Sequence, residues 1–220
     1  MSSHFEEFFG AEKSVLHDVG AQSHEISLSA GQCIFEESDP GNSVYYLIAG
    51  EARAIRYSVS GTEVQIATYR HGTLFGEMAA LCGAARSAGV YALTDVKLAV
   101  FSGTAFLSLM EKHGSIGLRV SQMLAHRIRN TTGRMFEHAT LSSKGRVYAE
   151  LIRLSRYEGG GAAPHIKQPP SNSEIARRLS IARETVSRTM NELQDEGAIQ
   201  RRADHLILLQ PQLLVSRLSC

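Results

Sequence analysis

The strongest constraint on the fold of this chain is a change in the spacing of its apolar residues at Ser102. Between Glu25 and Phe101, short runs rich in Val, Ile, Tyr and Leu alternate with turn residues roughly every ten positions, which is typical of a small all-β sandwich or barrel. From Gly103 to about His138 the chain has no proline, and its apolar residues recur at helical spacing. The sequence therefore predicts an α+β chain in which a β-rich part precedes helices.

Two of the predicted strands flank the short turn Gly50-Glu51. Along residues 45–49, positions 45, 47 and 49 form one face of a strand and positions 46 and 48 the other. Along residues 54–59, positions 54, 56 and 58 alternate with positions 55, 57 and 59 in the same way. Because two strands that share a short turn commonly pair, we expect a β-hairpin at this turn.

The longer helix, predicted from Ser115 to about His138, carries a heptad pattern. Steps of alternately four and three residues define one stripe, as in the seam of a two-stranded coiled coil. The stripe consists of Gly117, Ser121, Leu124, Ile128, Thr131, Met135 and His138. Its polar members would cost stability in an apolar seam, so we expect a loose seam or polar partners for them. Packing of this helix on its own domain is the alternative.

A domain boundary is predicted after residue 142. A helix over residues 144–157 should stop at the glycine-rich residues 158–161 and lead into a loop, followed by two helices and a short β-hairpin over residues 199–209. The first 142 residues carry 11 Lys and Arg against 14 Asp and Glu, whereas the remainder carries 12 against 8. This asymmetry suggests a polyanionic partner for the C-terminal part, with an ordinary solvated basic surface as the alternative.

The most informative stretch of the β-rich part spans residues 75–88. Gly76 permits close backbone approach, and the Glu77 carboxylate can accept a hydrogen bond from a ribose hydroxyl. The Arg86 guanidinium and nearby backbone N–H groups can neutralise a phosphate. The candidate ligand residues are Gly76, Glu77, Met78, Arg86, Ser87 and Ala88. A phosphorylated sugar suits this set, and a simple pairing of Arg86 with Glu77 is the alternative.

In its residue order this stretch resembles the phosphate-binding cassette of cyclic-nucleotide-binding domains, and residues 94–98 continue the resemblance to their β-roll. The resemblance implies that Glu77 contacts the ribose 2′-hydroxyl and that Arg86 contacts the cyclic phosphate. It also implies that Ser87 and Ala88 contact the phosphate oxygens.

The long helix is similar to the dimer helix of the cyclic AMP receptor family, which closes over the purine. Arg127, Thr131 and Thr132 match the family's arginine and its following Thr-Ser pair, with Thr in place of Ser at position 132. The resemblance implies cyclic AMP as the effector, with Thr131 and Thr132 of opposite subunits at the adenine. Cyclic GMP remains an alternative because a hydroxyl can donate or accept a hydrogen bond.

The C-terminal part has the pattern of two helices that cross at a tight turn. Ser171 or Asn172 can cap the first helix, and the small Ala176 permits a close crossing. The second helix presents a polar stripe of Arg183, Glu184, Ser187 and Arg188. Arg can donate to guanine O6 and N7, and a carboxylate can accept from cytosine N4, so this stripe can read DNA bases. A helical hairpin with a solvated arginine stripe is the alternative.

Residues 180–188 resemble the helix-turn-helix of the cyclic AMP receptor/FNR family, in which Arg183, Glu184 and Arg188 match the base-reading positions. Ser180 replaces the usual turn glycine, so we expect a strained or altered turn. Ala182 replaces the usual serine, which removes a phosphate contact. Residues 199–202 and 206–208 look like the wing of a winged helix.

The sequence therefore predicts a cyclic-nucleotide-binding β-roll, or jelly roll, over residues 1–112, a dimerisation helix over 113–141 and a winged helix-turn-helix over 142–220. The implied function is a homodimeric, cyclic-AMP-responsive transcription regulator that joins through residues about 115–138 and recognises a palindromic, TGTGA-like operator. Double-stranded DNA and RNA polymerase are the implied partners. The alternatives are a regulator that responds to cyclic GMP or another effector, and a constitutive regulator with a vestigial cassette.

Several protein classes fit the sequence poorly. Cys33, Cys82 and Cys220 are odd in number and widely spaced, which suits neither a disulfide framework nor a metal site. No apolar stretch approaches the ~20 residues that cross a bilayer, and the N-terminus lacks a secretory pattern, so we expect a cytoplasmic protein without membrane contact. No nucleophile–base pair or Walker loop indicates an enzyme.

Overall fold

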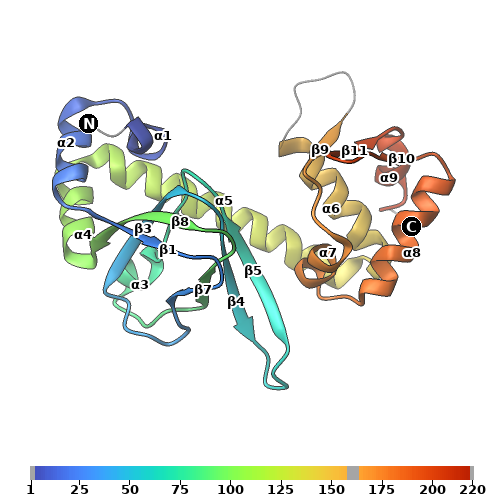
Figure 1. The fold of residues 1–220 in the computed structure, drawn as a ribbon, viewed down its shortest axis with the longest axis horizontal. Helices are drawn as coiled ribbons and strands as arrows, with labels where there is room; N and C mark the ends of the chain where they lie inside the picture. The colour runs from blue at the N-terminus through green and yellow to red at the C-terminus, as the bar shows by residue number, and fades with distance from the viewer. Residues whose placement is uncertain (1–2, 158–163, 219–220) are drawn as a thin grey trace. The chain divides into compact units, whose positions relative to one another are not determined.

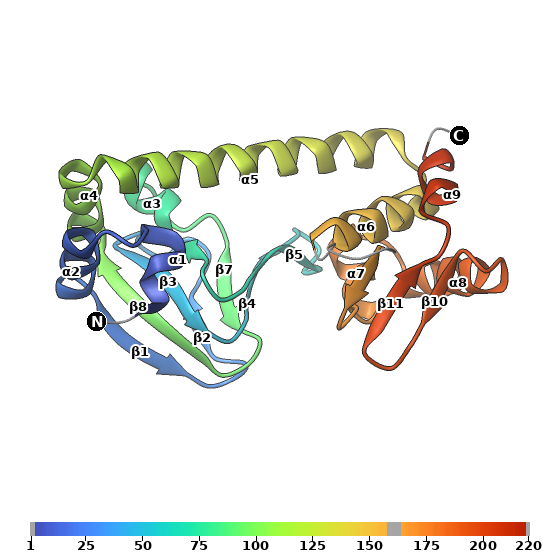
Figure 2. The ribbon, with the colours of Figure 1, turned by 90° about the horizontal axis from the view of Figure 1, so that it is seen from above.

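The computed structural model describes residues 3–157 and 164–218, and its contacts divide the chain into two compact units, Met1–Arg127 and Ile128–Cys220. Figure 1 shows the elements of both units. The division falls inside α5, Gly114–Thr140, which is one continuous helix (Figure 2). The three-part division drawn from the sequence remains a prediction.

The first unit is a β-sandwich of two four-stranded antiparallel sheets. The first sheet has the order β1 (His24–Leu28), β8 (Val96–Ser102), β3 (Ser43–Ala49) and β6 (Leu74–Phe75). The second has the order β2 (Cys33–Phe35), β7 (Gly89–Ala92), β4 (Ala52–Tyr57) and β5 (Glu63–Tyr69). This confirms the β-rich N-terminal part and the mixed α+β class.

The hairpin predicted at Gly50-Glu51 is wrong, because β3 and β4 belong to different sheets. The chain crosses from one sheet to the other at Gly50, where φ is +85° and an added Cβ would lie 2.2 Å from the Asp95 carbonyl oxygen. The crossing lets β3 pair with β8 and β6 in the sheet that helices cover. Alternation of apolar residues signals the two faces of a strand but does not identify its neighbour.

Helices cover the outer face of the first sheet. They are η1 (Ser3–Phe5), α1 (Glu6–Phe9), α2 (Lys13–Ala21), α4 (Gly103–Lys112) and the first part of α5. Both faces of β8 are therefore buried. Leu98 packs inside the sandwich, whereas Ala99 and Phe101 pack under the helices. The N-terminal helices η1, α1 and α2 were not predicted from the sequence. The remaining helix, α3 (Glu77–Cys82), follows β6 directly.

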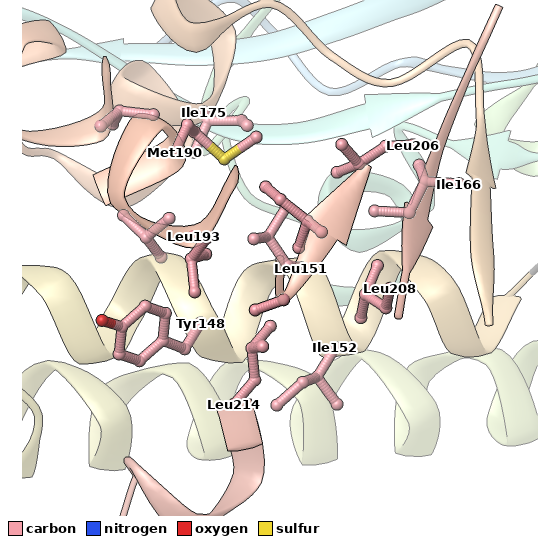
Figure 3. Close-up of a cluster of buried hydrophobic side chains, with 14 of the residues drawn as sticks. Tyr148, Leu151, Ile152, Ile166, Ile175, Met190, Leu193, Leu206, Leu208 and Leu214 are labelled. Atoms are coloured by element: carbon pink, nitrogen blue, oxygen red, sulfur yellow. The ribbon is translucent and has the colours of Figure 1, made fainter. Parts of the chain in front are cut away.

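The second unit surrounds a core formed by α6, two crossing helices and a small sheet. Its elements are α6 (Ser143–Tyr157), β9 (His165–Lys167), α7 (Asn172–Leu179), α8 (Arg183–Asp195), β10 (Ile199–Arg201), β11 (His205–Leu208) and α9 (Pro211–Ser216). Figure 3 shows Ile175 and Met190 of the crossing helices and Leu206 of the sheet in this core. The sheet has the order β10-β11-β9, so it gains a strand in a segment predicted as loop. The predicted stop at residues 158–161 lies outside the described residues.

The turn between α7 and α8 confirms the strain expected from the missing glycine. Ser180 has φ 52° and ψ 49°, in the left-handed region that costs a non-glycine residue about 1–2 kcal/mol. The Ser180 N–H still donates to carbonyl oxygens of α7, and the Ile181 N–H donates to Ala176 O at 3.1 Å. The turn therefore keeps helix-turn-helix geometry despite its residue type.

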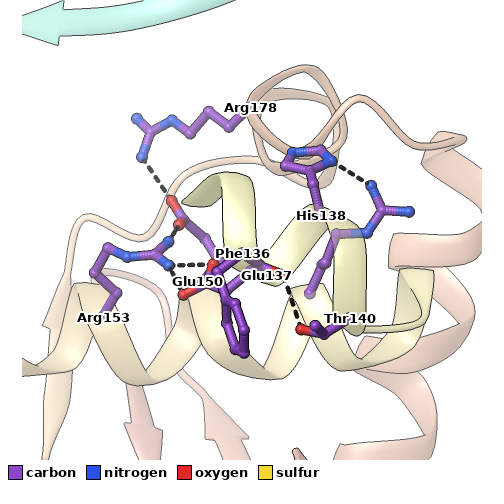
Figure 4. A network of polar contacts seen from close by, with 8 residues as sticks. Phe136, Glu137, His138, Thr140, Glu150, Arg153 and Arg178 are labelled. Atoms are coloured by element: carbon purple, nitrogen blue, oxygen red, sulfur yellow. Dashed lines mark hydrogen bonds and ion pairs between the residues drawn. The ribbon is translucent and has the colours of Figure 1, made fainter. Parts of the chain in front are cut away.

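An ion-pair network joins the last turns of α5 to α6 and α7 (Figure 4). Glu150 of α6 is 1% exposed, and its carboxylate pairs with Arg153 and, at 3.7 Å, with Arg178 of α7. Arg153 also donates to the Glu137 carboxylate at 2.5 Å. Beside it, His138 Nδ1 lies 2.9 Å from an Arg146 nitrogen, which supplies one of the polar seam positions with a partner.

We expect Glu150→Ala to lower the free energy of unfolding by about 3 kcal/mol, because it leaves two largely buried arginines without their shared anion. Urea unfolding of the full chain, followed by circular dichroism, measures the loss. Glu137→Ala is the matched control: its carboxylate is 27% exposed, and we expect a loss of at most about 1 kcal/mol. Equal losses in the two variants would show that burial of Glu150 is not what matters.

Candidate functional sites

Backbone geometry places the residues of the cassette around one small volume. Gly76 has φ +79°, and an added Cβ would lie 2.9 Å from an Arg86 terminal nitrogen and 3.2 Å from Ser43 O. Only glycine combines that conformation with that close approach. Glu77 follows as the first residue of α3 and is 1% exposed, so its carboxylate is drawn into the interior.

Arg86 is held by backbone carbonyls rather than by a carboxylate. The side chain is 5% exposed, and its Nη1 and Nη2 donate to Gly76 O at 2.8 Å and Ser43 O at 2.7 Å. The guanidinium carbon lies 4.2 Å from the centroid of the Phe35 ring, a cation–π distance. Burial lowers the pKa of Arg86 from its usual value. Its Nε is buried and has no hydrogen-bond partner among the described residues.

Glu77 pairs with Arg127 of α5. The alternative prediction, in which Glu77 pairs with Arg86, is therefore wrong. Arg127 Nη1 donates to Glu77 Oε1 at 2.7 Å, and Nη2 donates to Leu74 O at 2.6 Å. The other carboxylate oxygen, Glu77 Oε2, is buried and has no hydrogen-bond partner within the described chain. Such an acceptor is costly to leave unsatisfied, which makes Oε2 a natural contact for a ligand donor.

The cassette and Arg127 enclose a cavity of about 50 Å³. It is lined by Phe35, Tyr69, Gly76, Glu77, Met78, Ala79, Arg86, Ser87, Ala88, Val90 and Arg127. The structure thus brings together all six cassette candidates and Arg127. Thr131 and Thr132 are exposed farther along α5 and are not among the lining residues. Phe35 and Tyr69 were missed, because no motif distinguishes them from other strand aromatics.

The predicted DNA-reading stripe lies on α8. Arg183, Glu184 and Arg188 are exposed, while Val186 and Met190 bury the opposite face in the core. No side chain caps the N-terminus of α8 at Ala182. The cap of α7 is Ser171, which forms a capping box with Glu174.

Ser187, the fourth residue of the stripe, is half-buried and bonded within the protein. Its Oγ accepts a hydrogen bond from Asn172 Nδ2 at 3.1 Å, and Asn172 Oδ1 accepts one from Arg201 at 3.4 Å. From the sequence, Asn172 was predicted only as a possible helix cap, and Arg201 only as part of a wing-like hairpin. The pattern offered no signal for this contact, because it joins residues on three different elements.

The predicted seam of α5 presents apolar side chains to solvent. Ile128 and Met135 are 67% and 68% exposed. Ser121 donates its hydroxyl to Gly117 O at 2.9 Å, so it is satisfied within the helix. Ile128 and Met135 are therefore accessible to a second helix, whereas Leu124 packs against the core of the first unit, as the alternative prediction had it.

The described ranges, residues 3–157 and 164–218, contain neither a group of metal ligands nor a helix that could span a membrane. None of the His, Cys, Asp and Glu side chains there form a group of three or more arranged to hold a metal ion. None of the helices there combines the length and the apolar character needed to span a bilayer.

The geometry agrees with what comparisons with known proteins find. Residues 25–113 match the cyclic nucleotide-binding domain model, and residues 145–217 match the Crp-like helix-turn-helix domain model. The chain is 29% identical to the cyclic AMP receptor protein of Thermus thermophilus over 194 residues, covering 84% of this chain and 88% of that protein.

Two other proteins are similar over nearly the whole chain. The CRP-like cAMP-activated global transcriptional regulator of Mycobacterium tuberculosis is 23% identical over 212 residues, covering 96% of this chain and 95% of that protein. The solved structure of the c-di-GMP responsive global regulator CLP of Xanthomonas campestris superposes with a TM-score of 0.74 at 23% identity, covering 90% and 99% of the two chains. That structural likeness shows the shared fold.

We expect Arg127→Met to lower the free energy of unfolding by about 2 kcal/mol, because it leaves the Glu77 carboxylate buried without its cation. Adding Glu77→Gln to the same chain should recover part of the loss, since a neutral amide costs less to bury than a carboxylate. Urea unfolding of both variants measures the two effects. If Arg127→Met and the wild type had the same unfolding midpoint, the ion pair would not contribute to the stability of this unit.

Proposed function

Because the chain belongs to the cyclic AMP receptor/FNR family of transcription regulators, we propose that it is a homodimeric, cyclic-AMP-responsive regulator of a palindromic operator with TGTGA-like half-sites. The family consists of DNA-binding transcription regulators and not of enzymes. The observation that carries the proposal is the buried, unpartnered Glu77 Oε2 in the same cavity as Arg86.

The polar groups of the cavity suit a cyclic nucleotide. Glu77 Oε2 is an acceptor for the ribose 2′-hydroxyl. Arg86 uses one hydrogen of each terminal nitrogen on backbone carbonyls, which leaves Nε and the remaining hydrogens for a phosphate. The backbone N–H groups of Ser87 and Ala88 complete the anion site, and Gly76 and Met78 border it.

A nucleotide that enters the cavity changes the position of a side chain of α5. The cavity of about 50 Å³ is small beside the ~300–1,000 Å³ of typical ligand pockets. In this proposal, the nucleotide displaces the Arg127 side chain, which lines the cavity from α5. Arg127 belongs to the helix that carries the seam, so a ligand that favours its displaced position favours one arrangement of α5 by differential affinity.

The seam of α5, about residues 115–138, joins two subunits in this proposal. The exposed Ile128 and Met135 supply apolar contacts across the pair of helices. Thr131 and Thr132 of opposite subunits then reach the adenine of the bound nucleotide. The three-part division into residues 1–112, 113–141 and 142–220 belongs to the proposal, because it treats the seam as a separate functional part.

The two recognition helices of such a dimer enter successive major grooves, about 34 Å apart. Arg183, Glu184 and Arg188 are exposed on α8 and contact base edges, with Ser187 beside them. Double-stranded DNA and RNA polymerase are the proposed partners, and the cytoplasm is the proposed location.

A second candidate function is a DNA-binding regulator with a different effector, or with none. The small cavity favours an alternative in which the cassette is vestigial in a constitutive regulator. A cassette that responds to cyclic GMP or another effector is the other form of this candidate. The likeness to a regulator described as c-di-GMP responsive is consistent with a different effector on the same fold.

For the ligand, we expect Arg86→Ala to weaken cyclic AMP binding by roughly 10- to 100-fold, because a charge-assisted hydrogen bond is worth ~1.5–3 kcal/mol. Isothermal titration calorimetry with cyclic AMP and cyclic GMP measures this. Arg70→Ala is the matched control: Arg70 belongs to the same unit, pairs with Glu51 at 3.0 Å and lies outside the cavity lining. Absence of heat from folded wild-type protein would favour the second candidate.

For DNA, we expect Glu184→Ala to cost ~1–3 kcal/mol at one base pair and to relax the preference there. A mobility-shift titration on a TGTGA/TCACA duplex and its single-base-pair replacements, at one fixed salt concentration, measures the change. Asp195→Ala at the far end of α8 is the control and should leave the preference unchanged. Full preference in Glu184→Ala would exclude this residue as a base reader, and wild-type binding that ignores cyclic AMP would favour the constitutive alternative.

A further inference from the structure

Asn172 contacts both the recognition helix and the wing of the second unit. It is the first residue of α7, but Ser171 and Glu174 form the helix cap, so its own amide is not needed there. The side chain is half-buried and bonds to Ser187 of α8 on one side and to Arg201 of β10 on the other.

Donor and acceptor rules determine the direction of each bond in this chain. A guanidinium only donates hydrogen bonds, so the Asn172 atom facing Arg201 is the oxygen Oδ1. The amide nitrogen Nδ2 consequently faces Ser187, at 3.1 Å from its Oγ. Because an amide nitrogen only donates, the Ser187 hydroxyl is the acceptor in this contact.

The proton of the Ser187 hydroxyl is therefore left for another partner. The neighbouring Thr189 donates its hydroxyl to Thr185 O, four residues earlier, at 2.8 Å. Within the described residues, Ser187 makes no such bond, and its contact with Asn172 is its one side-chain hydrogen bond. Ser187 shares its face of α8 with the exposed Glu184 and Arg188.

We propose that Asn172, oriented by Arg201, is a positioning residue that holds Ser187 as a hydrogen-bond donor toward DNA. A serine hydroxyl without such a partner can donate or accept and so discriminates poorly between base edges. With one of its two lone pairs occupied by Asn172 and its proton free, Ser187 favours an acceptor such as thymine O4, guanine O6 or a purine N7 over the amino groups of cytosine and adenine. This inference rests on the proposed function of α8 as the recognition helix.

The test is Asn172→Asp, which reverses the polarity of the contact at nearly constant shape. A carboxylate only accepts, so the Ser187 proton turns toward it and the hydroxyl presents a lone pair to DNA. A carboxylate in the first turn of a helix is favourable, so we expect this variant to fold. Affinities are measured for the TGTGA/TCACA duplex and for every single-base-pair replacement in its half-sites, at fixed salt.

We expect two separable effects of Asn172→Asp. The added negative charge weakens binding to every duplex alike. In addition, the preference at one base-pair position shifts by about tenfold toward a base that presents an amino group. The same substitution in a Ser187→Ala chain should retain the uniform loss and lose the shift.

Two further variants complete the design. Asn191→Asp adds the same charge at an exposed position of α8 outside the network and should give a uniform change only. Arg201→Met removes the donor that orients the amide, and it should flatten the preference at the position affected by Asn172→Asp. Arg201 is exposed on β10, so this second variant tests the inference even if Asn172→Asp were to unfold the unit.

The outcomes separate this inference from the function on which it rests. An unchanged base ranking in Asn172→Asp and Arg201→Met, with a ranked wild-type profile, overturns the inference and leaves the regulator intact. A shift that persists in the Ser187→Ala chain also overturns it, because the effect then does not pass through the hydroxyl. A flat wild-type profile across all duplexes counts instead against the proposed operator.

Discussion

A carboxylate buried to 1% exposure needs a cation, and in this protein Arg127 supplies it to Glu77. The bond joins the first residue of α3, in the cassette, to α5, which follows the β-sandwich in sequence. The same guanidinium donates to Leu74 O, so it also holds the strand that leads into the cassette. One side chain thus connects the wall of the cavity to α5.

The cassette combines this satisfied ion pair with an uncompensated positive charge. Among the described residues, no carboxylate forms an ion pair with Arg86, which donates to two carbonyl oxygens and packs on Phe35. A buried cation without an anion is unfavourable, so the site favours a ligand that brings negative charge. One carboxylate oxygen and one guanidinium nitrogen stay without partners in the same small cavity, which matches a molecule that carries both hydroxyl and phosphate groups.

In the second unit, α8 buries apolar residues on one face and exposes polar residues on the other. Its apolar core and the buried Glu150 hold α6, α7 and α8 together, so the outer face of α8 needs no apolar residue. Strain at Ser180 is tolerated because both crossing helices are anchored in that core. Arg201 of β10 bonds to Asn172, which bonds in turn to Ser187, so these side chains connect a strand to α8.

The sequence alone determined the features that depend on local spacing: the change from β to helical period at Ser102, the ordered cassette from Gly76 to Ala88, and the helix-turn-helix with its strained Ser180. Each lies in one continuous stretch, where residue type and period report directly on backbone and chemistry. The tertiary structure alone decided that β3 and β4 lie in different sheets, that Glu77 pairs with Arg127 rather than Arg86, and that Asn172 bonds to Ser187. Those contacts join residues brought together by packing, and periodicity along the chain carries no information about which neighbour packing selects.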